Sequence, residues 1–207
     1  MFARKVLLPI AALALGGCAG MSEQACLVAD WQTVGFEDGA AGRPESTIGS
    51  HRQACSRHGV APDLEEYRVG HAAGVETYCR ASRGFEAGRS GAYYYGVCPA
   101  PLEPDFLAGY HSGRKLYELE SNLRSIDARI ASNERARENI KRELADIAAE
   151  SAASDTTAER RVELVARAAD LGRRHGELGA ENDRLREERV VHELELRDYQ
   201  QTLAFGF

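Results

Sequence analysis

Residues 116–147 read LYELESNLRSIDARIASNERARENIKRELADI, and this stretch decides the fold. Leucine and isoleucine recur along it at intervals of three and four residues, and Asn133 and Arg137 are the two polar exceptions. This spacing places one apolar stripe along a helix and is typical of a coiled-coil seam. We therefore expect a long helix whose apolar stripe needs a partner.

A second stretch with the same spacing, residues 164–203, offers that partner. Residues 151–157, SAASDTT, separate the two stretches and have the composition of a turn. We expect Asp155 or Thr156 to cap the helix that follows, because both side chains accept hydrogen bonds from free backbone N–H groups.

The register of the two helices can also be predicted. Folding the chain about Ser154 places Leu144 opposite Leu164 and keeps both seams aligned to their ends. The same fold places Asn133 opposite His175, as a polar layer that would define the register. This agreement favours an antiparallel hairpin within one chain, although the spacing also allows a parallel dimer of two chains.

The N-terminus has the features of an export signal. Arg4 and Lys5 precede a ten-residue apolar run, residues 6–15, which is too short to span a membrane permanently. Residues 15–18, LGGC, follow at once and resemble the bacterial lipobox, which implies that Cys18 becomes the acylated N-terminus. The alternative is an ordinary signal peptide with an incidental cysteine.

The residue after Cys18 bears on location. Ala19 stands where an aspartate would favour retention at the inner membrane, so we expect the chain at the periplasmic face of the outer membrane. Several acyl chains on Cys18 would give stable attachment.

The charge of the chain argues against nucleic acid as a partner. Removing residues 1–17 removes two positive charges and takes the formal net charge from −6 to −8. A protein that binds nucleic acid has to neutralise phosphates with Lys and Arg, and here the arginines are interspersed with acids.

The remaining four cysteines lie in the first half of the chain, at Cys26, Cys55, Cys79 and Cys98. An even number in an oxidising compartment predicts two disulfide bonds. Three pairings are open, and we favour the one that closes the shortest loops, 26 with 55 and 79 with 98. The rival interpretation is a zinc site, but no second paired ligand cluster stands at a matching spacing.

Glycines four residues apart recur in the same region. We expect them to let short helices pack closely, with aromatic rings beside them, because positions four apart share one helix face. The alternative is that they mark turns and helix ends. The packing glycines are Gly35, Gly39, Gly70, Gly74, Gly84, Gly88, Gly109 and Gly113.

Residues 91–99, GAYYYGVCP, lack a helical period and predict an extended loop. Tyr93, Tyr94 and Tyr95 within it form a candidate contact loop for a ligand. Packing of the three rings is the simpler interpretation.

These features define an all-α chain, with a small disulfide-stapled bundle of short glycine-rich helices followed by a long antiparallel helical hairpin, a coiled coil. The expected segments are a lipoprotein signal peptide over 1–17, a lipidated tether over 18–25, a Cys/Gly/aromatic helical domain over 26–104 and the hairpin over 105–207, with its turn near 150–158.

The order of small, aromatic and cysteine residues over about 22–125 resembles the small Gram-negative lipoproteins grouped as domain of unknown function 2799. The residues that carry this resemblance include Asp30-Trp31, Asp38-Gly39, Cys55, Gly70, Tyr78-Cys79, Cys98-Pro99 and Gly113. The family brings no established activity, so the resemblance implies a module without implying a reaction.

Two classes of function remain. The first is a non-enzymatic envelope lipoprotein, anchored through Cys18, whose hairpin contacts an unidentified envelope protein or another copy. The second is a periplasmic ligand-binding or hydrolytic module that uses the tyrosine loop with nearby acids and histidines. The candidate polar residues for it are Asp30, Asp38, His51 and His71. We assign no catalytic, cofactor-binding or metal-ligating residue, and we expect no cofactor.

Overall fold

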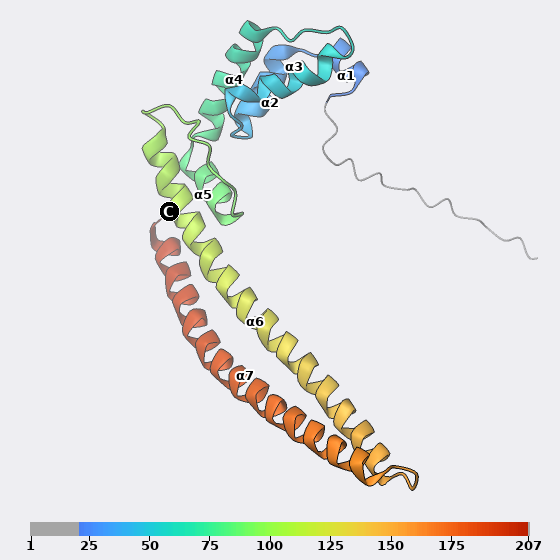
Figure 1. The fold of residues 1–207 in the computed structure, drawn as a ribbon. Coiled ribbons are helices and arrows are strands. Elements are labelled where there is room, and N and C mark those ends of the chain that lie inside the picture. The colour runs from blue at the N-terminus through green and yellow to red at the C-terminus, as the bar shows by residue number, and fades with distance from the viewer. Residues whose placement is uncertain (1–20, 207) are drawn as a thin grey trace, which may run out of the picture. The chain divides into compact units, whose positions relative to one another are not determined.

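The computed structural model describes residues 21–206, and it confirms the all-α fold class, because this part of the chain contains helices and no strand. Cys18 and the expected signal peptide lie outside the described residues. The α-helices are α1 (Glu23–Leu27), α2 (Trp31–Ala40), α3 (Ile48–Ser56), α4 (Leu64–Tyr78), α5 (Ala81–Arg89), α6 (Glu103–Ala152) and α7 (Ala158–Gly206), with a 3₁₀ turn at Glu45–Thr47 (Figure 1). Within residues 21–206 no helix is both long and apolar enough to cross a membrane.

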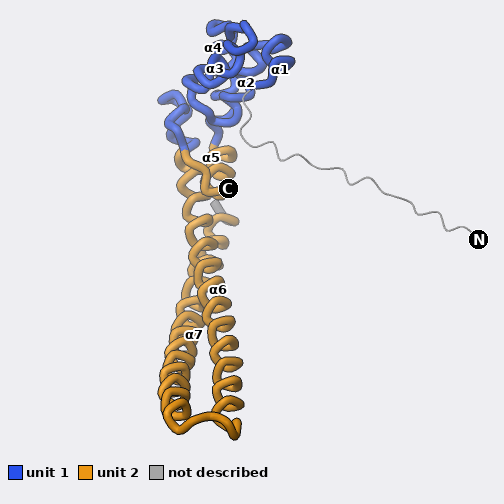
Figure 2. The backbone as a smooth tube through the Cα atoms, turned by 45° about the vertical axis from the view of Figure 1, so that its right-hand side comes forward, with its two compact units in different colours: residues 1–80, 94–106 blue, residues 81–93, 107–207 orange. Residues whose placement is uncertain are grey.

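The chain forms two compact units (Figure 2). Unit 1 comprises residues up to 80 together with 94–106, and unit 2 comprises 81–93 together with 107 onwards. Helix α5 therefore belongs to the same unit as the hairpin, whereas its glycines alone suggested a place in the Cys/Gly/aromatic domain. Its contacts with α6, described below, account for this.

In unit 1, helices α2 and α4 lie against each other along their glycines. A Cβ atom on Gly70 would be 2.7 Å from the carbonyl carbon of Gln32, and one on Gly39 would be 2.8 Å from the backbone nitrogen of Val75. Real Cβ atoms essentially never come this close to backbone. Gly35 and Gly74 make equally close backbone contacts, so these four glycines act as packing positions.

Side-chain caps start both helices. The Asp30 carboxylate accepts a hydrogen bond from Thr33 N at 3.0 Å, and Asp63 accepts from the backbone nitrogens of Glu65 and Glu66. Such caps satisfy donors that have no partner within the helix. Asp30 is thus occupied as the N-cap of α2.

Both predicted disulfide bonds are present, and both lie in unit 1. Cys26 is bonded to Cys55 and Cys79 to Cys98, the pairing with the shortest loops. The first bond packs with Trp31 and Tyr67 in the core of the unit. Cys55 is therefore unavailable as a metal-binding thiolate.

In unit 2, α5 packs on the start of α6 through a second set of close glycines. A Cβ on Gly109 would be 2.8 Å from the carbonyl carbon of Ala81, and one on Gly88 would be 2.7 Å from the nitrogen of Arg114. Gly113 meets the backbone of Phe85 in the same way, and Gly84 is buried in α5. The repeated glycines of the sequence thus serve two separate helix pairs.

Helices α6 and α7 form an antiparallel hairpin, as both views show (Figures 1 and 2). Ile126, Ile140, Leu164 and Leu185 are buried along it. The loop is 153–157, and the cap of α7 is Thr157, whose Oγ1 accepts from Arg160 N at 3.2 Å, rather than the predicted Asp155 or Thr156.

The predicted polar layer of the hairpin was wrong. Asn133 Nδ2 donates to Asn182 Oδ1 at 3.0 Å, and Asn182 is fully buried, so Asn133 is paired with an amide about two turns beyond His175. His175 and Asn182 are one heptad apart on the same helix, and Asn133 meets the second of them.

Candidate functional site

The most elaborate polar cluster of unit 1 is centred on Asp38, a residue of α2 that is 2% exposed. Its carboxylate accepts three hydrogen bonds of 2.8 Å, from Arg43 Nη1, His51 Nε2 and Tyr67 Oη. These donors come from the loop after α2, from α3 and from α4, so the cluster joins the helices of the unit.

The electrostatics of this cluster keep Asp38 ionised. Burial alone would raise the pKa of its carboxyl, but the hydrogen bonds from His51, Tyr67 and Arg43 outweigh burial and hold the pKa below its usual value. Burial, followed by the hydrogen bond to Asp38, raises the pKa of the Tyr67 phenol well above its usual range. The tyrosine therefore stays protonated as a donor.

The arrangement is better suited to structure than to proton transfer. A general base needs a free lone pair within reach of a substrate proton, and the Asp38 carboxylate is enclosed and already accepts from three donors. The rings around it also pack on one another, with His51 6.2 Å from Tyr67 and Tyr67 stacked on His71 at 5.8 Å. Sequence reasoning named Asp38 and His51 separately, but their spacing carries no signal that they meet, and it missed Tyr67 and Arg43.

A cleft of about 450 Å³ opens beside this cluster in unit 1. His71 and Tyr95 line it together with Glu45 and Glu76. His71 Nε2 is 2.8 Å from the carbonyl oxygen of Arg43, and Glu45 is bound to an arginine of α4. Of the four polar residues proposed for a ligand module, only His71 reaches this cleft, since Asp38 and His51 meet beneath it and Asp30 caps α2.

The three tyrosines of the candidate contact loop have different surroundings. Tyr94 packs on Phe106 with ring centroids 4.7 Å apart, and its hydroxyl donates to Glu103 and accepts from the Cys98 backbone. Tyr95 lines the cleft, and Tyr93 is 73% exposed. Tyr94 therefore packs within unit 1.

No metal centre is evident in the part of the chain that the structure describes. No three His, Cys, Asp or Glu side chains between residues 21 and 206 come together in a way that could hold an ion.

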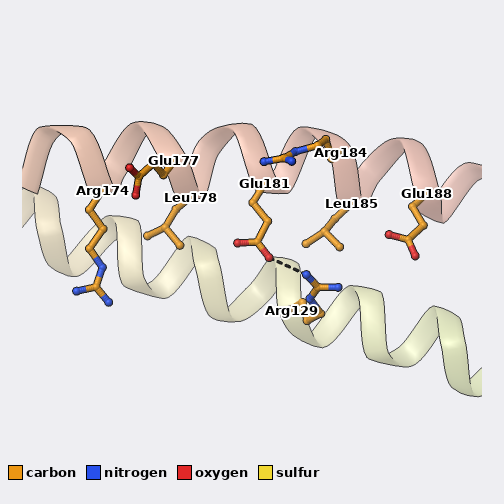
Figure 3. Close-up of a pocket in the computed structure, with 8 residues that line it drawn as sticks. All are labelled: Arg129, Arg174, Glu177, Leu178, Glu181, Arg184, Leu185 and Glu188. Atoms are coloured by element: carbon orange, nitrogen blue, oxygen red, sulfur yellow. Dashed lines mark hydrogen bonds and ion pairs between the residues drawn. The ribbon is translucent and has the colours of Figure 1, made fainter.

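A cleft of unit 2 lies between the helices of the hairpin and measures about 540 Å³ (Figure 3). Leu178 and Leu185 of α7 point toward α6, and charged side chains surround them, including an ion pair between Arg129 and Glu181 at 2.8 Å (Figure 3). Exposed ion pairs of this kind contribute about 0–1 kcal/mol each, so this charged cleft is mainly solvated surface of the coiled coil.

The outer face of α7 differs from this charged surface, because it carries exposed apolar side chains. Among the described residues of the hairpin, every large apolar side chain that is exposed belongs to α7, and none belongs to α6. The exposed residues are Val162, Val165, Val190, Val191 and Leu194, at 44–71% exposure. Isolated exposed apolar residues are ordinary, but the confinement of all five to one helix distinguishes α7 from α6.

Comparison with known proteins found a family match in the middle of the chain. Residues 30–115 match a family described as protein of unknown function (DUF2799). No curated protein and no solved structure shows a significant match to the chain. The matched range begins at the cap of α2 and ends just after Gly113, so it covers both pairs of glycine-packed helices. The match over residues 30–115 confirms the resemblance to the DUF2799 family that the order of glycines, aromatics and cysteines predicted.

Proposed function

We propose that this protein is a lipid-anchored envelope protein without enzymatic activity, which binds another protein through the α6–α7 hairpin. The observation that carries the proposal is the set of exposed valines and leucine on α7, because large apolar side chains on an otherwise charged rod are best explained by a partner that covers them.

Two further features support the location. The sequence LGGC at 15–18 has the form of an acylation site at Cys18, after a short apolar signal. The two disulfide bonds of unit 1 suit an oxidising compartment such as the periplasm. The outer membrane is the preferred site of attachment, since Ala19 lacks the charge associated with retention at the inner membrane.

The anchor is tested by metabolic labelling. Cells that make the wild-type chain and cells that make the Cys18→Ser variant are grown with radioactive palmitate. We expect label on the wild-type chain and none on the variant. An unlabelled wild-type chain would remove the anchor from the proposal.

The interaction is tested in living cells with a photo-crosslinking amino acid at Val165 of α7. The matched control carries it at Ala128, which is exposed on α6. We expect a discrete crosslinked product from position 165 that is absent from position 128. Identical patterns at both positions, or no product at either, would contradict a binding role for α7.

The alternative, a periplasmic module that binds or hydrolyses a small ligand, would have to use the cleft beside His71 and Tyr95. Two of the polar groups there are already engaged, since His71 contacts the Arg43 carbonyl and Glu45 is bound to Arg68. The binding role of the hairpin is therefore the better-supported function.

A further inference from the structure

The exposed apolar residues of α7 share one face of the helix. At 3.6 residues per turn, all five fall within an arc of about 100°. They form two groups near the ends of a stretch roughly 50 Å long, with Val162 and Val165 at one end and Val190, Val191 and Leu194 at the other.

Between these groups the same face carries very small residues. Gly176 and Ala180 are exposed there, and a Cβ on Gly176 would meet nothing within 4 Å. No contact inside the hairpin requires this glycine, whereas Gly109 on α6 lies in close contact with the backbone of α5. It leaves a smooth surface on which another helix could approach closely.

The arrangement is self-complementary. If a second α7 lies antiparallel on this face, with a two-fold axis beside Leu178, Val165 falls opposite Val191 of the other copy. By the same operation Gly176 falls opposite Ala180. Apolar side chains therefore face apolar side chains at both ends of the strip, and small residues face small residues at its centre. A two-fold interface requires this property, because one surface has to complement itself.

The charges on this face obey the same symmetry. Arg173 falls opposite Asp183 of the second copy, with Glu187 one turn away. In the single chain these side chains make only exposed pairs within α7, Arg173 with Asp170 and Asp183 with Arg186. They are therefore free to exchange partners across an interface at little cost.

We propose that the partner of the α7 face is a second copy of this chain, bound antiparallel about a two-fold axis near Leu178. This inference rests on the proposed binding role of the hairpin and names its partner. The covered strip, about 50 Å by 10 Å, amounts to roughly 500 Å² per copy and lies below the ~800 Å² of a standard interface. The dimer is accordingly expected to be weak and transient in solution.

The geometry is tested by crosslinking in the purified full mature chain with Cys18→Ser, which needs no detergent. One preparation carries Val165→Cys and another Val191→Cys, and each is treated with a short bismaleimide alone and after mixing. We expect a crosslinked dimer from the mixture and almost none from Val165→Cys alone, because the two copies of residue 165 would be roughly 40 Å apart along the rod. Efficient crosslinking of Val165→Cys to itself, or none in the mixture at 100-micromolar order, overturns the proposal.

The charge pairing is tested by sedimentation equilibrium. Arg173→Glu should raise the dissociation constant at least about fivefold, and adding Asp183→Arg to the same chain should recover most of that loss, because the pair is restored with its signs exchanged. Ala128→Glu on α6 is the matched control and should leave the constant unchanged. Circular dichroism verifies that each variant keeps its helices. An Arg173→Glu variant that dimerises like the control refutes the proposed pairing.

The outcome separates this inference from the function on which it rests. A monomeric purified chain that still crosslinks from Val165 to a different envelope protein would overturn the dimer and keep the binding role. A crosslink from Val165 in cells to a second copy of the chain would support both, and a monomeric purified chain without any crosslink from Val165 in cells would overturn both.

Discussion

Replacing Gly70 by alanine should strongly destabilise unit 1, although alanine is the better helix former. In a helix interior the change alone would stabilise by about 1 kcal/mol. The new Cβ, however, would lie 2.7 Å from the carbonyl carbon of Gln32 and closer still to its oxygen, where ordinary contacts begin at 3.4 Å, so α4 has to move from α2 by at least about 1 Å.

That movement also affects the buried carboxylate. The bond from Tyr67 Oη to Asp38 spans the same two helices and measures 2.8 Å, so a shift of about 1 Å takes it beyond hydrogen-bonding range. Overpacking costs about 1–3 kcal/mol, and a weakened bond to a buried charge adds about 1.5–3 kcal/mol. After the gain in propensity, we expect the free energy of unfolding to fall by about 1.5–5 kcal/mol.

The assay is urea unfolding with intact disulfides, followed by tryptophan fluorescence. Trp31 is the only tryptophan and lies in the core of unit 1, so the signal reports this unit alone. The matched control is Gly49→Ala in α3, where a Cβ meets nothing within 4 Å and stability should be unchanged or slightly higher. Equal stability of the Gly70→Ala variant and the wild type would refute the close approach of α2 and α4.

Three further outcomes are expected. The pKa of Asp38 lies below its ordinary value of 3.8 in the folded state, so between the folded and unfolded pKa values the unfolded state binds more protons. The stability due to Asp38 should therefore be complete above about pH 5 and decline as the pH falls through 3.8. An Asp38→Asn variant should lose that decline in urea titrations at several pH values. Replacing Cys79 and Cys98 together by serine should lower the free energy of unfolding by about 3 kcal/mol, as loop entropy predicts for a sequence separation of 19, and a loss under 1 kcal/mol would contradict this. Gly109→Leu should destabilise unit 2 by at least about 1 kcal/mol, because α5 lies against that glycine, and hydrogen exchange of the α5 amides should accelerate; Gly172→Ala, at an open position of α7, should not accelerate it.

Local patterns in the sequence predicted much of this fold, because the face that a helix buries is determined by residues three and four positions apart. The seam spacing predicted the hairpin, and glycines four apart predicted close helix packing. The partner of each glycine could not be predicted, since Gly70 and Gly109 carry the same spacing but contact different helices. The pairing of Asn133 with Asn182 could not be predicted either, because a heptad repeat places His175 and Asn182, seven residues apart, on the same seam.

The Asp38 cluster shows a different limit. Its hydrogen-bond donors come from three separate segments of the chain. The sequence positions of these donors follow no periodic spacing, so the sequence does not reveal that they meet. A buried carboxylate is also unexpected from composition, since aspartate is usually exposed. Only the folded arrangement of α2, α3 and α4 explains why this residue tolerates burial.

The Cys79–Cys98 bond has a topological consequence. It closes a covalent ring that contains all of α5, although α5 belongs to unit 2 and both cysteines belong to unit 1. The polypeptide therefore crosses between the units three times, and a single protease cut within the ring leaves the two fragments tethered. Such a nick would be silent on a gel without reductant and would separate the chain into two pieces once thiols were added, so the redox state of the compartment determines whether the damage is tolerated.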